Sequence, residues 1–264
     1  MKKYVLAFKL SMARITAYRL DVFMGKIRNI IALLLLYYVW LTLSATTGTF
    51  AGLSATELTT YVFMASVAGR AVFAGNTRRV SSDINDGTFS NYLTRPVNHF
   101  VFTYFEELAE RIFQTILACI EVVILLALLQ TEILLQTNMT QLAFFFVTLF
   151  FAHILYYIMT YAMALISFWS REAMGPRFLF DWFVDFAAGS YFPLHLLSGI
   201  FLMVAAALPF MYLLYAPIMI YLGHFTIGQS IDVILIQLCS IVFIGTITNI
   251  LWHRGLRQYS AEGI

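Results

Sequence analysis

The distribution of basic residues along the chain is the feature that most constrains its fold. Residues 178–253 are 76 consecutive positions without Lys or Arg, and all 16 basic residues lie before this stretch or in the short tail after it. Hydrophobic residues make up 61% of the sequence and charged residues 11%, whereas soluble domains carry about 25% charged residues. No soluble core of this size could enclose so much apolar surface. The sequence therefore predicts an integral membrane protein with a fixed orientation.

Six segments are long and apolar enough to cross a bilayer, which takes about 20 residues. They are 29–46, 57–75, 112–131, 141–168, 177–193 and 231–252. The segments between them alternate in charge, because Lys and Arg are absent from 47–56, 132–140 and 194–230. Basic loops are retained in the cytoplasm, so both termini are expected on that side. Residues 1–264 are treated as a single transmembrane domain.

Residues 1–26 are predicted to form an amphipathic helix in the membrane interface. An apolar stripe recurs at helical spacing, with Lys2, Lys3 and Lys9 turned away from it. Its members are Tyr4, Phe8, Met12, Ile15, Tyr18 and Val22. The stripe is imperfect, since Arg19 falls within it and Leu6 and Leu10 lie off it. A plain cytoplasmic extension is the alternative.

Residues 76–100 are the longest polar stretch and are predicted to hold two short helices on the cytoplasmic side. Asp86-Gly87 is a turn signal, Thr88 can cap the second helix, and Arg95-Pro96 ends it. The large apolar residues of this segment need a surface to pack on, for which a partner protein is the obvious candidate. They are Val80, Ile84, Phe89, Tyr92 and Leu93. An ordinary loop is the alternative.

The same segment resembles a known family. Residues 83–89 (DINDGTF) and 92–98 (YLTRPVN) are similar to the D-I-x-x-G … L-x-R-P-[VL]-N signature of an uncharacterised permease group within the ABC-2 exporter superfamily. Three further stretches agree with that group in the same order along the chain. They are the acidic-to-arginine run at 106–111, the proline-marked region from 191 to 223, and the closing W-x-R-G-L-x-x-Y pattern within 251–260.

The resemblance implies an all-α integral membrane fold of six transmembrane helices. It adds an elbow helix before the first span, a cytoplasmic coupling helix between spans two and three, and an outer re-entrant helical hairpin at 194–228 between spans five and six. Segments 194–208 and 210–222 are apolar but too short to span singly, and prolines interrupt them. An arrangement of eight spans is the alternative, in which both segments cross.

The resemblance further implies a permease subunit of an ATP-driven exporter in a bacterial inner membrane, moving a hydrophobic or amphipathic molecule outward. The chain has no G-x-x-x-x-G-K-[ST] phosphate loop, so it is not expected to be an enzyme or to hold a cofactor itself. ATP and Mg²⁺ would bind a separate ATPase subunit, present in two copies beside two permease chains that are identical or paralogous. The expected coupling residues are Asp83, Ile84, Asp86, Gly87, Phe89, Tyr92, Leu93, Arg95 and Pro96.

Four ionisable residues are predicted within spans: Arg70, Glu121, Asp181 and Asp185. A charge at mid-bilayer costs about 2.5–3.5 kcal/mol on insertion scales, so such residues usually face protein or water. Asp181 and Asp185 share one helical face and repel each other unless a cation or proton intervenes. Arg70, placed as the only basic residue inside a span, is their candidate partner. A polar lining of the substrate route and simple ion pairing or hydration are both open interpretations.

Two other function classes have less support. A membrane-embedded enzyme would need a nucleophile or metal constellation, and the sequence has no G-x-S-G, no G-x-G-D and no zinc pair. Cys119 and Cys239 make no disulfide framework. A proton-coupled carrier could use Glu121, Asp181 and Asp185 as a relay, but inverted internal repeats are not evident. The aromatic-rich composition does not select a substrate.

Overall fold

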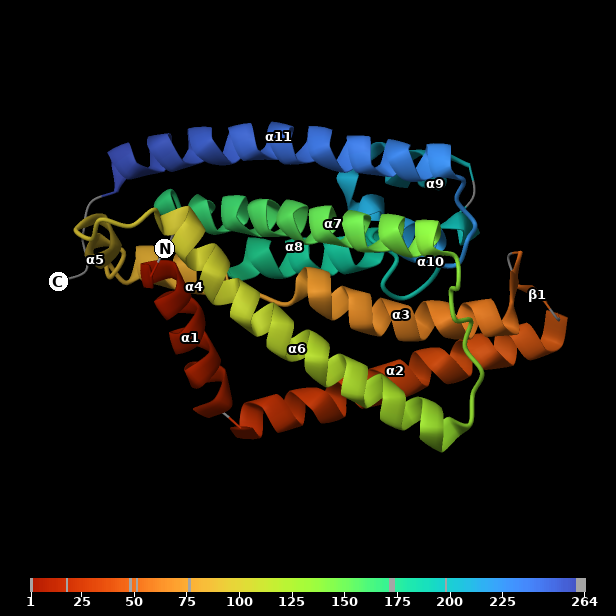
Figure 1. Cartoon of the computed structure of the whole chain (residues 1–264). Helices are drawn as coiled ribbons and strands as arrows, with labels where there is room; N and C mark the ends of the chain where they lie inside the picture. The colour runs from red at the N-terminus through yellow and green to blue at the C-terminus, as the bar shows by residue number, and fades with distance from the viewer. Residues whose placement is uncertain are drawn as a thin grey trace.

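Long helices dominate the computed structural model of the chain (Figure 1). The structure describes residues 2–17, 19–47, 49–50, 52–75, 77–170, 174–197 and 199–259. Several positions of the predicted segments lie outside these ranges, among them Tyr18 of the amphipathic stripe, Asn76 at the start of the polar stretch and Ser260 of the closing motif.

The described part of the first half contains six helices and a short antiparallel hairpin in which Thr49 pairs with Ser54. The elements are α1 (Lys2–Ala17), α2 (Arg19–Thr47), β1 (Thr49–Phe50), β2 (Leu53–Ser54), α3 (Ala55–Phe73), α4 (Arg78–Asn85), α5 (Ser90–Leu93) and α6 (His99–Leu129). The second half contains α7 (Met139–Leu165), α8 (Met174–Ala187), α9 (Ile200–Ala207), α10 (Tyr215–Tyr221) and α11 (Ile227–Gln258), with 3-10 turns at Ile166–Phe168, Leu194–Leu196 and Pro209–Tyr212.

Among the described residues, five helical stretches are long and apolar enough to cross a membrane: Leu20–Ser44, Ala55–Asn85, His99–Leu129, Met139–Phe168 and Ile227–Gln258. The predicted span at 177–193 is not among them. Its helix, α8, has 14 residues and is therefore about 21 Å long, against a hydrocarbon thickness of about 30 Å. The helix ends at Ala187 because the chain turns at Gly189, where φ is +82°. The sixth span stays a prediction.

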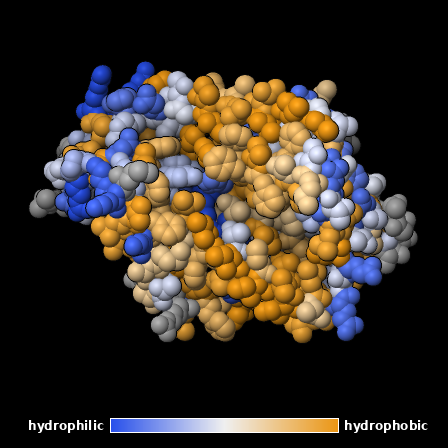
Figure 2. Space-filling view, in the orientation of Figure 1, coloured by the Kyte–Doolittle hydropathy of each residue, from blue (hydrophilic) through white to orange (hydrophobic). Residues whose placement is uncertain are grey.

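The exposed surface agrees with a membrane-spanning bundle. Figure 2 shows a broad apolar band between two hydrophilic ends. Large apolar side chains on α2, α6 and α11 are more than half exposed, among them Leu35, Val123, Leu128, Val242 and Phe243. Side chains of this kind are stable at the surface where the surrounding medium is lipid rather than water.

Two apolar clusters hold the helices together. The larger one joins α3, α7 and α10, and includes Tyr61, Leu155 and Ile218, each exposed by 1% or less. The smaller one lies where α4, the end of α7 and the end of α11 meet, and includes Val80 and Tyr161. The smaller cluster therefore fastens the α4 end of the bundle, whereas the larger one runs along its interior.

The segment between α8 and α11 is broken into short pieces at the end of the molecule opposite α5 (Figure 1). The helices α9 and α10 have 8 and 7 residues, so they are about 12 and 10.5 Å long and neither can cross a bilayer alone. This length argues against the eight-span alternative. Every residue of α10 is buried, whereas Ile200, Phe201 and Met203 of α9 are about 70% exposed.

Residues 2–17 form the helix α1, but its exposed apolar face differs from the predicted stripe. The predicted stripe turns partly toward α6, because the Tyr4 ring stacks on Phe105 at 5.8 Å between centroids and the Ser11 hydroxyl donates to the Glu106 carbonyl at 2.9 Å. The exposed apolar face instead carries Leu6 and Leu10, which are 55% and 58% exposed. The predicted face is therefore wrong, since packing on α6 takes part of the stripe.

Candidate functional site

The turn between α4 and α5 has the form predicted from its sequence. Gly87 adopts φ +73°, a conformation that favours glycine, and reverses the chain between the two short helices. The Phe89 amide donates to the Asp83 carbonyl at 2.8 Å, which closes the turn. Thr88, predicted to cap α5, instead donates to the Asp83 carboxylate at 3.2 Å. Helix α5 ends at Leu93, ahead of the Arg95-Pro96 pair.

Phe89 lies inside the chain and not on its surface. Its side chain is fully buried, and its ring contacts those of His99, Phe168, Tyr259 and Trp252 at centroid distances of 4.9, 5.5, 5.5 and 5.8 Å. The prediction that it needs a partner protein to pack on is therefore wrong. The sequence could not reveal this, because three of these rings, those of Phe168, Trp252 and Tyr259, come from residues distant in the sequence.

The other apolar residues of the segment differ in how far they are buried. Val80 and Ile84 are 2% and 5% exposed and belong to the same cluster as Phe89. Tyr92 is half-buried; burial, together with the nearby charge of Asp83, raises the pKa of its hydroxyl. Leu93, at 47%, is the one large apolar side chain of the described segment that is strongly exposed.

The surface around Leu93 is formed by the tip of the segment, from Asn91 to Pro96. Asn91, Leu93, Thr94, Arg95 and Pro96 are all exposed. The Arg95 guanidinium lies 6.0 Å from the centroid of the Tyr92 ring, and Lys3 of α1 donates to the Pro96 carbonyl. We call the five exposed residues the coupling tip. It is an exposed surface on a segment that is anchored by its own buried rings.

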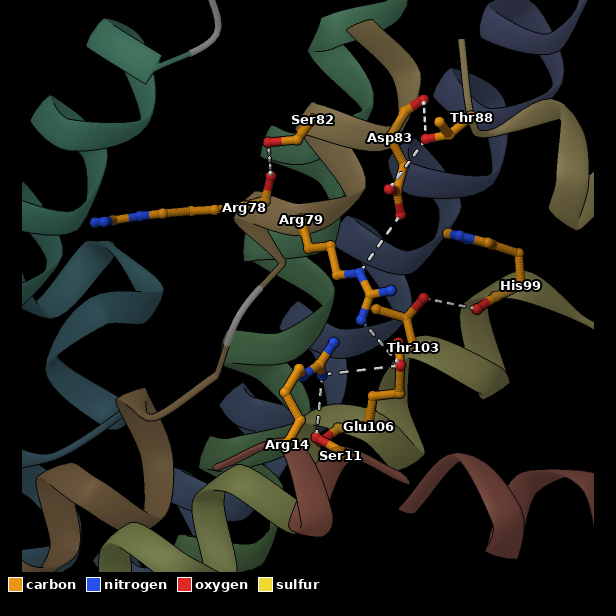
Figure 3. Close-up of polar contacts among 10 residues, drawn as sticks. All are labelled: Ser11, Arg14, Arg78, Arg79, Ser82, Asp83, Thr88, His99, Thr103 and Glu106. Atoms are coloured by element: carbon orange, nitrogen blue, oxygen red, sulfur yellow. Dashed lines mark hydrogen bonds and ion pairs between the residues drawn. The ribbon is translucent and has the colours of Figure 1, made fainter. Parts of the chain in front are cut away.

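A carboxylate on α6 connects three helices beneath this tip (Figure 3). Glu106 accepts a hydrogen bond from Arg79 of α4 at 3.4 Å and lies 3.9 Å from Arg14 of α1. Arg79 also lies 3.9 Å from Asp83, one turn further along α4. Glu106 thus joins α4 and α1 to α6 through one side chain.

Asp181 is paired at the opposite side of α4. In Figure 3, Arg78 points away from the Glu106 cluster, and its guanidinium bonds Asp181 of α8 at 2.7 Å. Arg177 bonds the other Asp181 oxygen at 2.8 Å and also donates to the Thr77 hydroxyl at 2.7 Å. Adjacent arginines of one short helix thus reach α6 on one side and α8 on the other.

Nearly the whole chain matches one known protein family. Residues 8–263 match the family described as ABC-2 family transporter protein. The chain belongs to the ABC-2 transporter family. It is therefore a multi-pass membrane protein that takes part in membrane transport. Members of this permease family are transport subunits without a catalytic centre. No curated protein and no solved structure matches the chain.

Arg70 of this ABC-2 permease does not pair as predicted. Its guanidinium donates to the Asn29 side chain of α2 at 2.8 Å. Within the described parts of the chain, neither Asp181 nor Asp185 lies within 4.0 Å of it, although the charges of Glu121 and Asp185 act on it at longer range. The predicted pairing is wrong for Asp181, which is held by Arg78 and Arg177. For Asp185 the charge of Arg70 acts at longer range without a direct ion pair.

Glu121 is partnered by a lysine that the sequence analysis left outside the spans. Lys26 lies within the candidate span Leu20–Ser44, and its ammonium group is 3.2 Å from Glu121. The two side chains are 15% and 6% exposed. The second carboxylate oxygen of Glu121 is buried without a hydrogen-bond partner among the described residues. Arg70 is therefore not the only basic residue inside a span of the permease.

A second buried pair was also missed. Glu107 and Arg111, one turn apart on α6, form an ion pair at 3.1 Å, and Arg111 also donates to the Val72 carbonyl of α3. The signal was present, since the i, i+4 spacing favours such a pair. It was overlooked because the third span was predicted to begin at residue 112, whereas α6 begins at His99.

In the described part of the permease, no group of three or more His, Cys, Asp or Glu side chains is placed to hold a metal ion. Cys119 and Cys239 are free thiols on the exposed surface. The functional features that remain are the coupling tip and the polar contacts behind it.

Proposed function

We propose that the chain is the permease subunit of an ATP-driven exporter and that a separate ATPase subunit binds its coupling tip. The observation that carries this proposal is the contrast between Phe89, which is fully buried, and Leu93, which is 47% exposed four residues later. A partner that pushes on an exposed apolar side chain transmits force only if the supporting segment is packed. The buried rings behind α5 supply that support.

Force applied at the coupling tip would reach the spans by two polar routes. The Arg79–Glu106 contact links α4 to α6 and to the elbow helix α1. The Arg78–Asp181 contact links α4 to α8. The ring of Phe89 adds an apolar route, because Trp252 belongs to α11. One short helix would therefore move elements on both sides of the bundle together.

The wider assembly follows the family pattern. We propose both termini in the cytoplasm of a bacterial cell, two ATPase copies and a second permease chain, identical or paralogous. The segment 194–228 would form a re-entrant hairpin on the outer side. The cargo would be hydrophobic or amphipathic, and Glu121 with its unpartnered oxygen is the best candidate for a polar group on its route.

The experiment is co-purification of the tagged chain with a candidate phosphate-loop ATPase, which we expect an adjacent reading frame to encode. Leu93→Asp should keep the folded yield of the permease and reduce ATPase recovery about tenfold or more, since a charge replaces an apolar contact. Leu135→Asp is the matched control, because Leu135 is 72% exposed in the loop before α7, away from the coupling tip. If Leu93→Asp retains both the ATPase and substrate-stimulated ATP hydrolysis, the coupling tip is not the docking surface.

A further inference from the structure

A groove of about 870 Å³ lies between residues 92–100, α7 and the C-terminal half of α11. One wall is the chain from Tyr92 to Phe100, the floor includes Tyr161 of α7, and the other wall is the α11 face from Ile241 to His253. Of the residues that line it, Leu93 and Arg95 also belong to the coupling tip. Helix α11 therefore faces this segment across an open space.

The charge of the groove favours an anionic ligand. Its described lining contains Arg95 and no Asp or Glu. Asn98 and Asn249 add side-chain amides, and Thr246 adds a hydroxyl. Arginine binds phosphate through charge-assisted hydrogen bonds, and amide and hydroxyl groups donate further bonds to its oxygens. A phosphate group fits this set better than a cation does.

The length and polarity of the groove match one lipid molecule. From Ile241 to His253 the α11 wall advances 12 residues, which is about 18 Å. One leaflet with its headgroup region is about 20–22 Å thick. The polar residues Asn249 and His253 lie toward the end of α11, whereas Ile241 and Val242 lie deeper in the apolar band. Val242 is 69% exposed, so the deep end opens toward lipid.

We infer that this groove binds one anionic phospholipid from the leaflet at the α4–α5 end, with its phosphate at Arg95 and an acyl chain along Ile241 and Val242. The lipid would touch Trp252, whose ring packs on Phe89 at 5.8 Å. It would thus fill the space between α11 and residues 92–100 reversibly. The assignment does not depend on the transport proposed above.

The test uses the full chain purified in detergent and native mass spectrometry. The protein is titrated with phosphatidylglycerol, with phosphatidylcholine of the same acyl chains, and with glycerol phosphate as the soluble headgroup alone. Gly245→Leu fills the groove, because nothing lies within 4 Å of a Cβ at this position. Gly25→Leu on α2 is the matched control, since its Cβ also meets nothing within 4 Å. Arg95→Gln is compared with Arg257→Gln, an exposed arginine beyond the groove.

We expect one tightly held phosphatidylglycerol per wild-type chain, bound about tenfold or more tightly than phosphatidylcholine, and no retained glycerol phosphate. Gly245→Leu should lose both lipids, Arg95→Gln should lose the preference for the anionic one, and both controls should behave as wild type. Equal lipid retention by wild type and Gly245→Leu would overturn the site. Conversion of a dimer to a monomer by Gly245→Leu would also overturn it, because the groove would then be an interface between two copies. Retention of glycerol phosphate alone would show a soluble anion site instead.

Discussion

Arg111 and Glu107 form an ion pair in which each side chain is only 3% exposed, although both belong to a helix whose surface mostly faces lipid. Arg111 also donates to the Val72 carbonyl near the end of α3 and lies 5.6 Å from the centroid of the Tyr156 ring of α7. Gly75 passes so close that a Cβ there would lie 2.5 Å from a Glu107 oxygen. The pair thus joins α3, α6 and α7 at the level where α3 gives way to α4.

Removing one member of this pair should be more damaging than removing both. Arg111→Met leaves a buried carboxylate without a counter-charge, and breaking a buried pair in this way costs about 3–5 kcal/mol. The double variant Arg111→Met/Glu107→Gln should recover part of the loss in apparent melting temperature and folded yield. Strictly additive effects in the double-mutant cycle would contradict direct pairing.

Gly255 is expected to tolerate no side chain. A Cβ at this position would overlap the ring of Phe168, which also packs on Phe89. Gly255→Ala should therefore lower stability by about 1–3 kcal/mol, the usual cost of overpacking. Gly245→Ala is the control on the same helix, because its Cβ meets nothing within 4 Å. Equal melting temperatures for the two variants would show that the cluster around Phe89 is loosely packed.

Two double-mutant cycles can distinguish which arginine interacts directly with Asp181. Arg177→Gln and Asp181→Asn should be strongly non-additive, since their charged atoms lie 2.8 Å apart. Arg70→Gln and Asp181→Asn should add to within about 0.5 kcal/mol, because no direct contact joins them. The measured quantity is thermal stability in detergent. Coupling between Arg70 and Asp181 comparable to that of Arg177 would refute the assignment.

The Lys26–Glu121 pair should respond asymmetrically to substitution. Lys26→Met leaves a carboxylate that is 6% exposed and has one oxygen already without a partner, so folded yield should fall. Glu121→Gln should be milder, because a long lysine can extend toward the membrane surface. Folded yield by fluorescence-detected size-exclusion chromatography compares the two. Equal losses would indicate that Glu121 reaches water.

Orientation is tested by labelling introduced cysteines in intact cells with a membrane-impermeant maleimide. Thr137→Cys, in the loop before α7, should label from outside, whereas Asn91→Cys at the coupling tip should label only after permeabilisation. Both positions are exposed in the structure. Asn91→Cys labelling in intact cells would reverse the proposed topology.

Much of the fold could be predicted from the sequence wherever the structure of a segment depends on that segment and on the surrounding lipid or water alone. Apolar length located five of the spans, and Asp86-Gly87 and Arg95-Pro96 placed the turn and the end of α5. These features are local, because a bilayer selects for length and a tight turn selects for glycine at positive φ. The end of α8 was missed, since the turn at Gly189 is held by Tyr61 of α3, whose hydroxyl donates to the Gly189 carbonyl at 2.6 Å.

The sequence by itself determined that this is a helical membrane protein with a polar, turn-containing segment between its second and third spans, because hydropathy acts residue by residue against lipid and water. Only the tertiary structure decided what each side chain of that segment does. Phe89 and Leu93 look alike in the sequence, yet one is enclosed by rings from distant helices and the other is exposed. Arg177 had the i, i+4 spacing for a pair with Asp181, and only the tertiary structure showed that Arg70 contacts Asn29 instead. Burial and ion pairing depend on which helices meet, and that geometry is a property of the whole bundle.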